Sequence, residues 1–152
     1  MGVLKVLSLF SGIGAFEEAL NNLHIKNELI NYCEFDPTAA KAYSLIHNVS
    51  EDLNLGDITN VDETKISDFD LMTYGFPCQD ISALGDMKGL TDDGKLTRSG
   101  LFFEAMRIAK YKKPKYMIAE NVRMLASKKF KNDLEAMLKL LDSIGYNSYW
   151  KV

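Results

Sequence analysis

Residues 3–14 read VLKVLSLFSGIG, and this stretch decides the fold. Residues 3–9 are apolar and partly β-branched with a single lysine, which is typical of a central strand in a parallel sheet. A glycine loop follows, and then apolar residues recur at helical spacing, at Phe16, Ala19, Leu20 and Leu23. Glycines let a backbone approach a ligand closely, and a helix amino terminus offers free N–H groups. This order predicts half of a nucleotide-type binding site, although a tight β-to-α turn would also explain the loop.

Strand and helix patterns alternate along the rest of the chain. Apolar runs predict further strands at residues 29–33, near 56–58, and at 70–74, 116–119 and 146–152. No repeat, low-complexity tract or composition shift marks a domain boundary. The pattern therefore predicts one α/β domain over residues 1–152, with a mostly parallel, Rossmann-like sheet and helices on both faces.

Caps and apolar stripes predict three further helices. Asp36 and Pro37 mark the start of one, as N-cap and first helical residue. Its inner stripe comprises Ala39, Ala40, Tyr43 and either Ile46 or His47. Another helix runs from Ser99 to about Lys110. The last ends at Gly145, a C-terminal cap, and its apolar face comprises Phe130, Leu134, Met137, Leu138, Leu141 and Ile144.

The composition is that of an ordinary globular protein. The chain has 152 residues, of which 47% are hydrophobic and 26% are charged, and no apolar run is long enough to cross a bilayer. We expect no signal peptide, because the first residues lead directly into a strand. The two cysteines form no CxxC pair and no metal cluster with the two histidines, which predicts no metal and a reduced, cytoplasmic setting. The net charge of −3 is not typical of a nucleic-acid-binding surface over the whole molecule, so any positive charge that faces a nucleic acid must be local or lie outside this sequence.

Residues 75–79 read GFPCQ and follow the predicted strand 70–74. Cys78 therefore comes at the carboxyl end of a strand, where parallel sheets place ligands and chemistry. Pro77 restricts its own φ and the backbone of the preceding residue, while Gly75 lets the chain turn. This arrangement can hold a reactive thiol in a fixed pose, and a buried structural cysteine is the alternative.

Two acidic residues follow later strand ends. Glu34 lies about 20 residues past the glycine loop, where a carboxylate can accept hydrogen bonds from ribose hydroxyls; a solvated strand end is the alternative. Asp57 ends the predicted strand near residues 56–58, and a capping aspartate is the alternative for it. His47 is interpreted as a helix-end residue rather than a catalyst, because no partner for it is visible in the sequence.

Three segments in this order and at this spacing, FSGIG at 10–14, GFPCQ at 75–79 and ENV at 120–122, resemble the DNA cytosine-5 methyltransferase family. The resemblance implies the S-adenosylmethionine-dependent methyltransferase fold, S-adenosylmethionine as cofactor, and double-stranded DNA with a flipped cytosine as partner. It implies that Cys78 is the nucleophile, that Glu120 binds the N3 side of the base and that Asn121 orients either the nucleophile loop or Glu120. The cofactor contacts that it implies are Phe10, Ser11, Gly12, Gly14, Glu34, Phe35, Asp57, Ile58, Gly75, Pro77 and Leu101.

The resemblance covers only the amino-terminal part of the family's pattern. The family's Gln-x-Arg-x-Arg element, its target-recognition domain and its carboxyl-terminal helix find no match in the sequence. We therefore expect an incomplete catalytic domain, which is a truncated piece, a subunit of a split enzyme or a decayed fragment. Its expected partner is a separate carboxyl-terminal chain, or a second copy paired through a sheet edge. The leading hypothesis is the methyltransferase of a restriction–modification system; the alternatives are a transfer-RNA cytosine-5 methyltransferase and a non-catalytic cofactor- or partner-binding fragment.

Overall fold

The computed structural model describes residues 2–77, 91–92, 95–96 and 98–152, with the side chains of residues 2–77 and 101–152. It contains two compact units: Met1–Phe76 with Arg107–Glu120, and Pro77–Met106 with Asn121–Val152. The predicted nucleophile Cys78 lies outside the described residues. In the part of the chain that the structure describes, no helix is long and apolar enough to cross a membrane.

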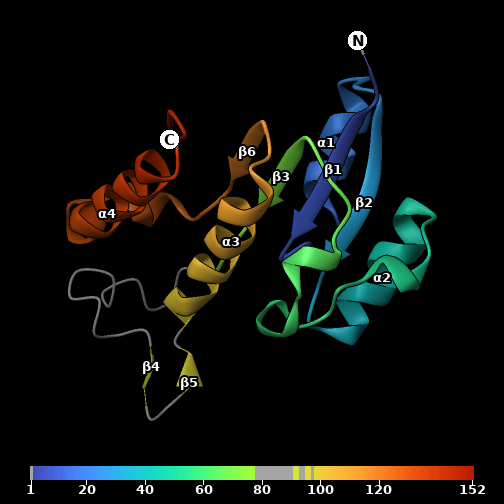
Figure 1. Ribbon diagram of the computed structural model, residues 1–152, viewed down its shortest axis with the longest axis horizontal. Helices are drawn as coiled ribbons and strands as arrows, with labels where there is room; N and C mark the ends of the chain where they lie inside the picture. Colours follow the sequence, from blue (N-terminus) through green and yellow to red (C-terminus); the bar gives the residue numbers. More distant parts are fainter. Residues whose placement is uncertain (1, 78–90, 93–94, 97) are drawn as a thin grey trace. The chain divides into compact units, whose positions relative to one another are not determined.

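The first unit is built on a four-stranded sheet with the order β2-β1-β3-β6 (Figure 1). All three strand pairings are parallel, which confirms the predicted α/β class and mostly parallel sheet. The strands are β1 (Leu4–Leu9), β2 (Asn27–Cys33), β3 (Leu71–Tyr74) and β6 (Tyr116–Ala119). Since the strands are parallel, the loops that follow them leave from the same edge of the sheet.

The central strands β1 and β3 are buried on both faces. Every residue of β3 is buried, as are the last four of β1, and all of these except Ser8 and Thr73 are apolar, which is typical of a parallel strand covered by helices. Val6 and its register partner Leu71 pack with Leu20 of α1 (Ala15–Asn22) on one face. The β2 residue Tyr32, which is in register with the next β1 residue on that face, packs with α2 (Pro37–His47). Helices α1 and α2 therefore cover the same face.

The apolar stripe predicted for the first helix is only partly correct. Leu20 is buried, but Ala19 is exposed and Leu23, the C-cap residue, is 70% exposed. The inner face instead includes Glu17, which is 5% exposed. A helix of eight residues offers only about two turns to the sheet. The last residue of the predicted apolar stripe therefore lies past the part of the helix that contacts the sheet.

The second helix begins as predicted. Asp36 is the N-cap, and its carboxylate accepts hydrogen bonds from the N–H groups of Thr38 and Ala39, both at 2.8 Å. Of the two candidates for the end of its inner stripe, Ile46 is 57% exposed, whereas His47 packs against Tyr43. The stripe therefore ends at His47.

The strand predicted near residues 56–58 is wrong. Residues 51–60 instead form two short 3-10 helices, η1 (Glu51–Leu53) and η2 (Ile58–Asn60), joined by an extended connector. This connector pairs with the edge of β2 through a single parallel bridge, between Asn54 and Tyr32. Gly56 adopts φ +69°, which takes the backbone out of the extended conformation that further pairing needs.

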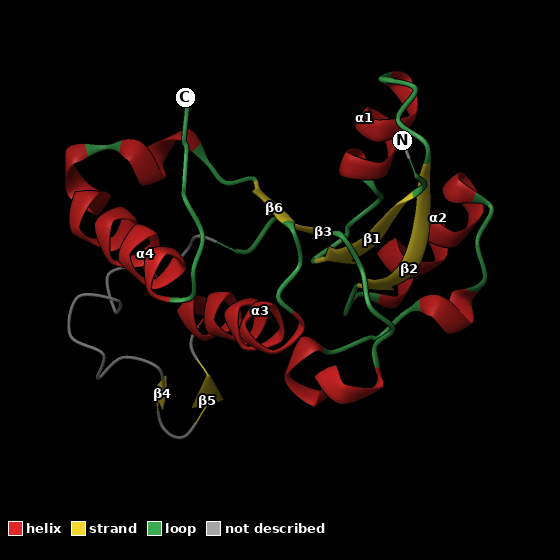
Figure 2. Cartoon of the chain, turned by 45° about the horizontal axis from the view of Figure 1, so that its top comes forward, coloured by secondary structure: helices red, strands yellow, loops and turns green. Residues whose placement is uncertain are grey.

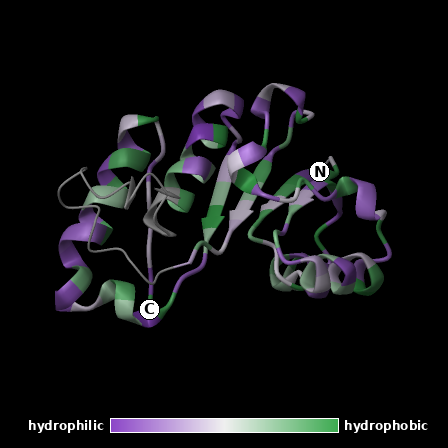
Figure 3. Ribbon diagram, turned by 90° about the horizontal axis from the view of Figure 1, so that it is seen from below, coloured by the Kyte–Doolittle hydropathy of each residue, from purple (hydrophilic) through white to green (hydrophobic). Residues whose placement is uncertain are grey.

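The second unit contains α4 (Lys131–Ser143), preceded by η5 (Arg123–Ala126) and η6 (Lys128–Phe130), and part of α3 (Arg98–Lys112) (Figure 2). The apolar face predicted for residues 130–144 is confirmed, because each of its members is buried or half-buried. Figure 3 shows how hydrophobic and hydrophilic residues alternate along the helices. The second unit also contains a short antiparallel pair, β4 (Thr91–Asp92) and β5 (Lys95–Leu96).

The strand predicted at residues 146–152 is also wrong. This segment has no regular secondary structure, and its residue Tyr149 is 96% exposed. A strand exists only when a partner supplies the matching backbone groups, and the described residues offer this segment no such partner.

Candidate active site

The glycine loop after β1 has an unusual backbone. Phe10, Gly12 and Gly14 adopt positive φ values of 54°, 55° and 86°. Ser11 stabilises this path, since its hydroxyl donates to the Ser8 carbonyl at 3.0 Å and accepts from the Cys33 N–H at 3.2 Å. The loop is therefore tied to the ends of both β1 and β2, and Gly14 leads directly into α1 as its N-cap.

Glu34 connects the glycine loop to the start of α2. One carboxylate oxygen accepts from the Gly12 N–H at 2.8 Å, and the other accepts from the Asp36 N–H at 2.8 Å. Each carboxylate oxygen can accept more than one hydrogen bond, so these contacts leave acceptor capacity for ligand hydroxyls. Glu34 and the glycine loop are thus in direct contact, through the hydrogen bond between the Glu34 carboxylate and the Gly12 N–H.

Asn54 organises the same region, and the sequence analysis did not identify it. Its side-chain amide donates to the Glu34 carbonyl at 3.0 Å, and its oxygen accepts from the N–H groups of Glu34 and Gly56 at 3.0 and 3.1 Å. It therefore bridges the segment that carries Glu34 and the one that carries Asp57. Its signal in the sequence is weak, because an asparagine between apolar residues is as typical of a simple turn.

Cys33 is a buried, structural thiol at the end of β2. It is 2% exposed and donates to the Gly56 carbonyl at 3.1 Å. Burial raises its pKa, as do the negative charges of Glu34 and Asp57, and together these effects bring it to about 12. Both carboxylates therefore lie close enough to act on one thiol, which remains neutral and unreactive at physiological pH.

Asp57 is the N-cap of η2. Its carboxylate accepts from the Thr59 N–H at 2.9 Å and from the Thr59 hydroxyl at 2.8 Å. Of its predicted neighbours in a cofactor site, Ile58 is only 4% exposed, whereas Phe35 is 77% exposed. Asp57 therefore does cap a helix, which was the alternative role predicted for it. The ring of Phe35 is exposed and available to a ligand.

Gly75 and Glu120 lie side by side after β3 and β6. The Glu120 N–H donates to the Tyr74 carbonyl at 3.2 Å, which continues the pairing of the two strands. A side-chain carbon placed on Gly75 would lie 3.7 Å from the Glu120 carboxylate. The carboxylate therefore lies over the backbone of the residue that opens the GFPCQ segment.

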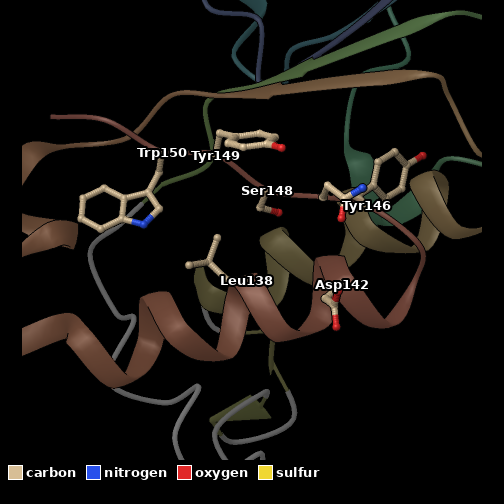
Figure 4. Close-up of a pocket in the computed structure, with 7 residues that line it drawn as sticks. Leu138, Asp142, Tyr146, Ser148, Tyr149 and Trp150 are labelled. Atoms are coloured by element: carbon tan, nitrogen blue, oxygen red, sulfur yellow. The ribbon is translucent and has the colours of Figure 1, made fainter.

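The remaining predicted site residues belong to the second unit. Pro77 and Leu101 are half-buried there, and the Asn121 side-chain oxygen accepts from the Val122 N–H at 2.8 Å. The second unit also has an open groove of about 350 Å³ between α4 and the last residues of the chain (Figure 4). Its lining comprises Leu138, Asp142, Tyr146, Asn147, Ser148, Tyr149 and Trp150. None of these residues is a predicted site residue.

Buried polar groups lie between α1, α2 and the sheet. The Glu17 carboxylate and the hydroxyls of Tyr43 and Ser8 are buried beside one another there. Burial raises the pKa of Tyr43, and the nearby Glu17 carboxylate raises it further. The contact between the two helices beneath the glycine loop is therefore partly polar.

Comparison with known proteins gives the family directly. Residues 4–152 match the family described as C-5 cytosine-specific DNA methylase. The orphan methyltransferase M.SPRI of Bacillus phage SPR is 44% identical over 146 residues, which are 96% of this chain and 32% of that protein. The type II methyltransferase M2.ScrFI of Lactococcus lactis subsp. cremoris is 31% identical over an alignment of 201 positions that covers 99% of this chain and 56% of that protein.

Solved structures agree with this result. The crystal structure of the S. pombe Dnmt2 methyltransferase matches with a TM-score of 0.71 and 27% identity, over 96% of this chain and 42% of that chain. The Entamoeba histolytica methyltransferase EhMeth matches with a TM-score of 0.69 at 18% identity, over 94% of this chain and 44% of that chain, which shows the shared fold. The chain spans about a third of the length of the phage SPR methyltransferase, at 32%. From its first strand to its last residue, this chain belongs to the C-5 cytosine-specific DNA methylase family.

Proposed function

We propose that the chain is the cofactor-binding and catalytic part of a DNA cytosine-5 methyltransferase, which transfers a methyl group from S-adenosylmethionine to carbon 5 of cytosine. One observation carries the proposal. The glycine loop and Glu34 follow the carboxyl ends of β1 and β2, and Gly75 and Glu120 follow the carboxyl ends of β3 and β6 at the same edge of the sheet. The Cys33–Gly56 hydrogen bond brings the segment that carries Asp57 to the end of β2. Parallel sheets bind ligands at this edge.

The residues present fit S-adenosylmethionine. A side-chain carbon on Gly12 would meet no atom within 4 Å, so the space beside the glycine loop is open to a ligand. The Glu34 carboxylate would accept from the ribose hydroxyls, and Asp57 would accept from the adenine amino group. Ile58, the next residue, would pack on the adenine ring, and the exposed ring of Phe35 would contact the cofactor as well. The family resemblance adds Phe10, Ser11, Gly14, Gly75, Pro77 and Leu101 to these contacts.

Cys78 would carry the covalent chemistry. Its thiolate adds to carbon 6 of the cytosine ring, and the new S–C bond makes carbon 5 nucleophilic. Bound S-adenosylmethionine would supply the electrophilic methyl group that carbon 5 takes, and its sulfur would keep the electron pair of the broken S–CH3 bond, leaving S-adenosylhomocysteine. Loss of the proton from carbon 5 to a base then lets the S–C bond break, which restores the double bond and releases Cys78.

Glu120 would stabilise the activated base. A protonated carboxyl at the N3 side donates a hydrogen bond as negative charge develops on the ring. The position of the Glu120 carboxylate over Gly75 supports this role, because Gly75 is three residues before Cys78 in the chain. Asn121 would orient either the loop that carries Cys78 or the Glu120 side chain.

The proposed substrate is cytosine in duplex DNA, flipped out of the helix so that both faces of its ring are accessible. The names of the relatives, orphan and type II methyltransferases, support a modification enzyme. Because the chain spans 32% of the phage SPR protein, we further propose that target recognition depends on residues outside 1–152.

The cofactor site can be tested with a matched pair of aspartates. Asp57 and Asp62 each cap a 3-10 helix and accept from the N–H and hydroxyl of the threonine two residues later. Alanine at either position removes the same cap, but only Asp57→Ala removes the adenine contact. We expect a loss of about 1 kcal/mol in S-adenosylmethionine binding, or roughly fivefold in Kd, for Asp57→Ala alone.

Isothermal titration calorimetry on the chain, alone and with the carboxyl-terminal part of a relative, measures this affinity. Thermal unfolding of both variants gives the shared cost of the lost cap. Equal affinities for Asp57→Ala and Asp62→Ala would place the adenine elsewhere.

The chemistry can be tested by trapping the nucleophile. DNA that contains 5-fluorocytosine should form a covalent adduct with the chain when cofactor and a carboxyl-terminal polypeptide are supplied, since fluorine at carbon 5 blocks the release of the thiol. Cys78→Ala should abolish the adduct and methyl transfer, whereas Cys33→Ala should retain both. Full activity of Cys78→Ala would refute the mechanism, and methylation of RNA in preference to DNA would reassign the substrate.

A further inference from the structure

The last residue of α2 touches the glycine loop. His47 Nε2 lies 2.9 Å from the carbonyl oxygen of Ile13. A carbonyl only accepts, so this nitrogen carries the hydrogen and donates it to the loop. The hydrogen bond joins residues that are 34 positions apart in the sequence.

Ring stacking holds the His47 side chain in this position. The imidazole packs against the Tyr43 ring, with centroids 4.5 Å apart and an interplanar angle of 48°. Tyr43 in turn stacks on Tyr32 of β2 at 4.2 Å and 15°. Both tyrosines are fully buried, so the row of rings connects the sheet to the glycine loop through a rigid path.

Gly14 makes room for the imidazole. A side-chain carbon on Gly14 would lie 1.9 Å from His47 Nε2 and 2.7 Å from its Cδ2. The position therefore requires glycine for two reasons, since its φ of +86° also disfavours any side chain. The ring fills the space that the missing side chain leaves.

We propose that His47 is a positioning residue for the cofactor loop, which it holds in its ligand-binding conformation through the Ile13 carbonyl. The inference rests on the proposed S-adenosylmethionine site. Phe10, Gly12 and Gly14 all adopt positive φ in this loop, a conformation that a free segment populates only part of the time. A loop that is already ordered loses less conformational freedom on binding. The hydrogen bond from His47 to the Ile13 carbonyl therefore raises cofactor affinity although His47 does not contact the ligand.

The test measures cofactor affinity and loop order in the same variants of the full chain. His47→Ala should weaken S-adenosylmethionine binding roughly three- to tenfold by calorimetry, as expected for one lost hydrogen bond and its ordering effect. Backbone amides of residues 11–15 should exchange with solvent faster in the variant without ligand. His47→Gln, whose side-chain amide can donate to the same carbonyl, should restore both values to within about twofold of the original.

Asn48→Ala is the matched control. Asn48 is the C-cap of the same helix in a left-handed conformation at φ 51°, so alanine there weakens the helix end without removing the loop contact. The proposal is overturned if Asn48→Ala weakens binding as much as His47→Ala does, or if His47→Ala leaves affinity and loop exchange unchanged. A wild-type chain that fails to bind the cofactor would refute the proposed function instead, and the exchange rates would still decide whether His47 orders the loop.

Discussion

At the scale of the residue, Cys33 shows how a thiol can serve the site without reacting. Its hydrogen bond to the Gly56 carbonyl joins the end of β2 to the segment that presents Asp57. Its burial between the Glu34 and Asp57 charges raises its pKa to about 12 from an ordinary value of 9.0. The two cysteines of the sequence therefore have different expected roles, with Cys33 structural and Cys78 the proposed nucleophile.

The raised pKa of Cys33 predicts a loss of stability in alkali. Between pH 9 and 12 the unfolded chain releases the thiol proton while the folded chain retains it, so folding stability falls as pH rises. We expect the free energy of unfolding to fall by about 1.4 kcal/mol more in the wild type than in Cys33→Ala between about pH 8 and about pH 10. Urea unfolding at both pH values measures the difference. Parallel pH curves for the two proteins would contradict it.

At the scale of the element, helix α4 ends through two defined backbone hydrogen bonds. The Tyr146 N–H donates to the Leu141 carbonyl at 3.0 Å, and the Gly145 N–H donates to the Asp142 carbonyl at 2.9 Å. This pair is the Schellman motif, and it requires a left-handed residue at Gly145, whose φ is +98°. The chain reverses there and passes back along α4, where it lines the groove shown in Figure 4.

Gly145→Ala should destabilise the chain by about 1 kcal/mol, because alanine disfavours the left-handed conformation. A side-chain carbon at this position would meet no atom within 4 Å, so the whole effect is conformational. Gly145→Asn should lose less, since asparagine tolerates this conformation better. Chemical denaturation measures both, and Gly2→Ala, at a glycine with open space and no positive φ, is the control. Equal losses for alanine and asparagine would show that another interaction is responsible.

At the scale of the whole molecule, β6 is an edge strand of the sheet, and we expect this edge to determine assembly. It is the last strand in the order β2-β1-β3-β6, so one of its edges pairs with β3 and the other has no partner strand among the described residues. Two of its large apolar side chains are also exposed to solvent, Tyr116 at 60% and Ile118 at 45%. An unpaired apolar edge is a template for another strand, either from a second copy or from a separate polypeptide.

We predict that residues 1–152 by themselves self-associate and do not methylate DNA. The proposed cofactor and nucleophile groups are present, but the chain covers 32% of the phage SPR methyltransferase, so most of what contacts DNA in such an enzyme is expected from elsewhere. Light scattering and a methyl-transfer assay on mixed-sequence DNA test both statements. Adding the carboxyl-terminal part of a relative should reduce self-association and produce activity. A monomer that methylates DNA unaided would refute the prediction.

The sequence by itself determined the features that depend on neighbouring residues. The glycine loop between β1 and α1, the Asp36 cap and the Gly145 cap are all where their local patterns predict them, because such signals act within one turn of backbone. The parallel sheet followed from the alternation of strands and helices. The family motifs likewise stand at strand ends, where Glu34 and Glu120 lie.

Only the tertiary structure decided what depends on a distant partner. Two predicted strands, near residues 56–58 and at 146–152, are absent because strand formation requires backbone partners that sequence periodicity does not supply. Asn54 and His47 gained their roles in the same way, through hydrogen bonds to Glu34 and Ile13 across 20 and 34 positions. A side chain's type limits the contacts that it can make, but the packing of α2 and the sheet determines which of these contacts form.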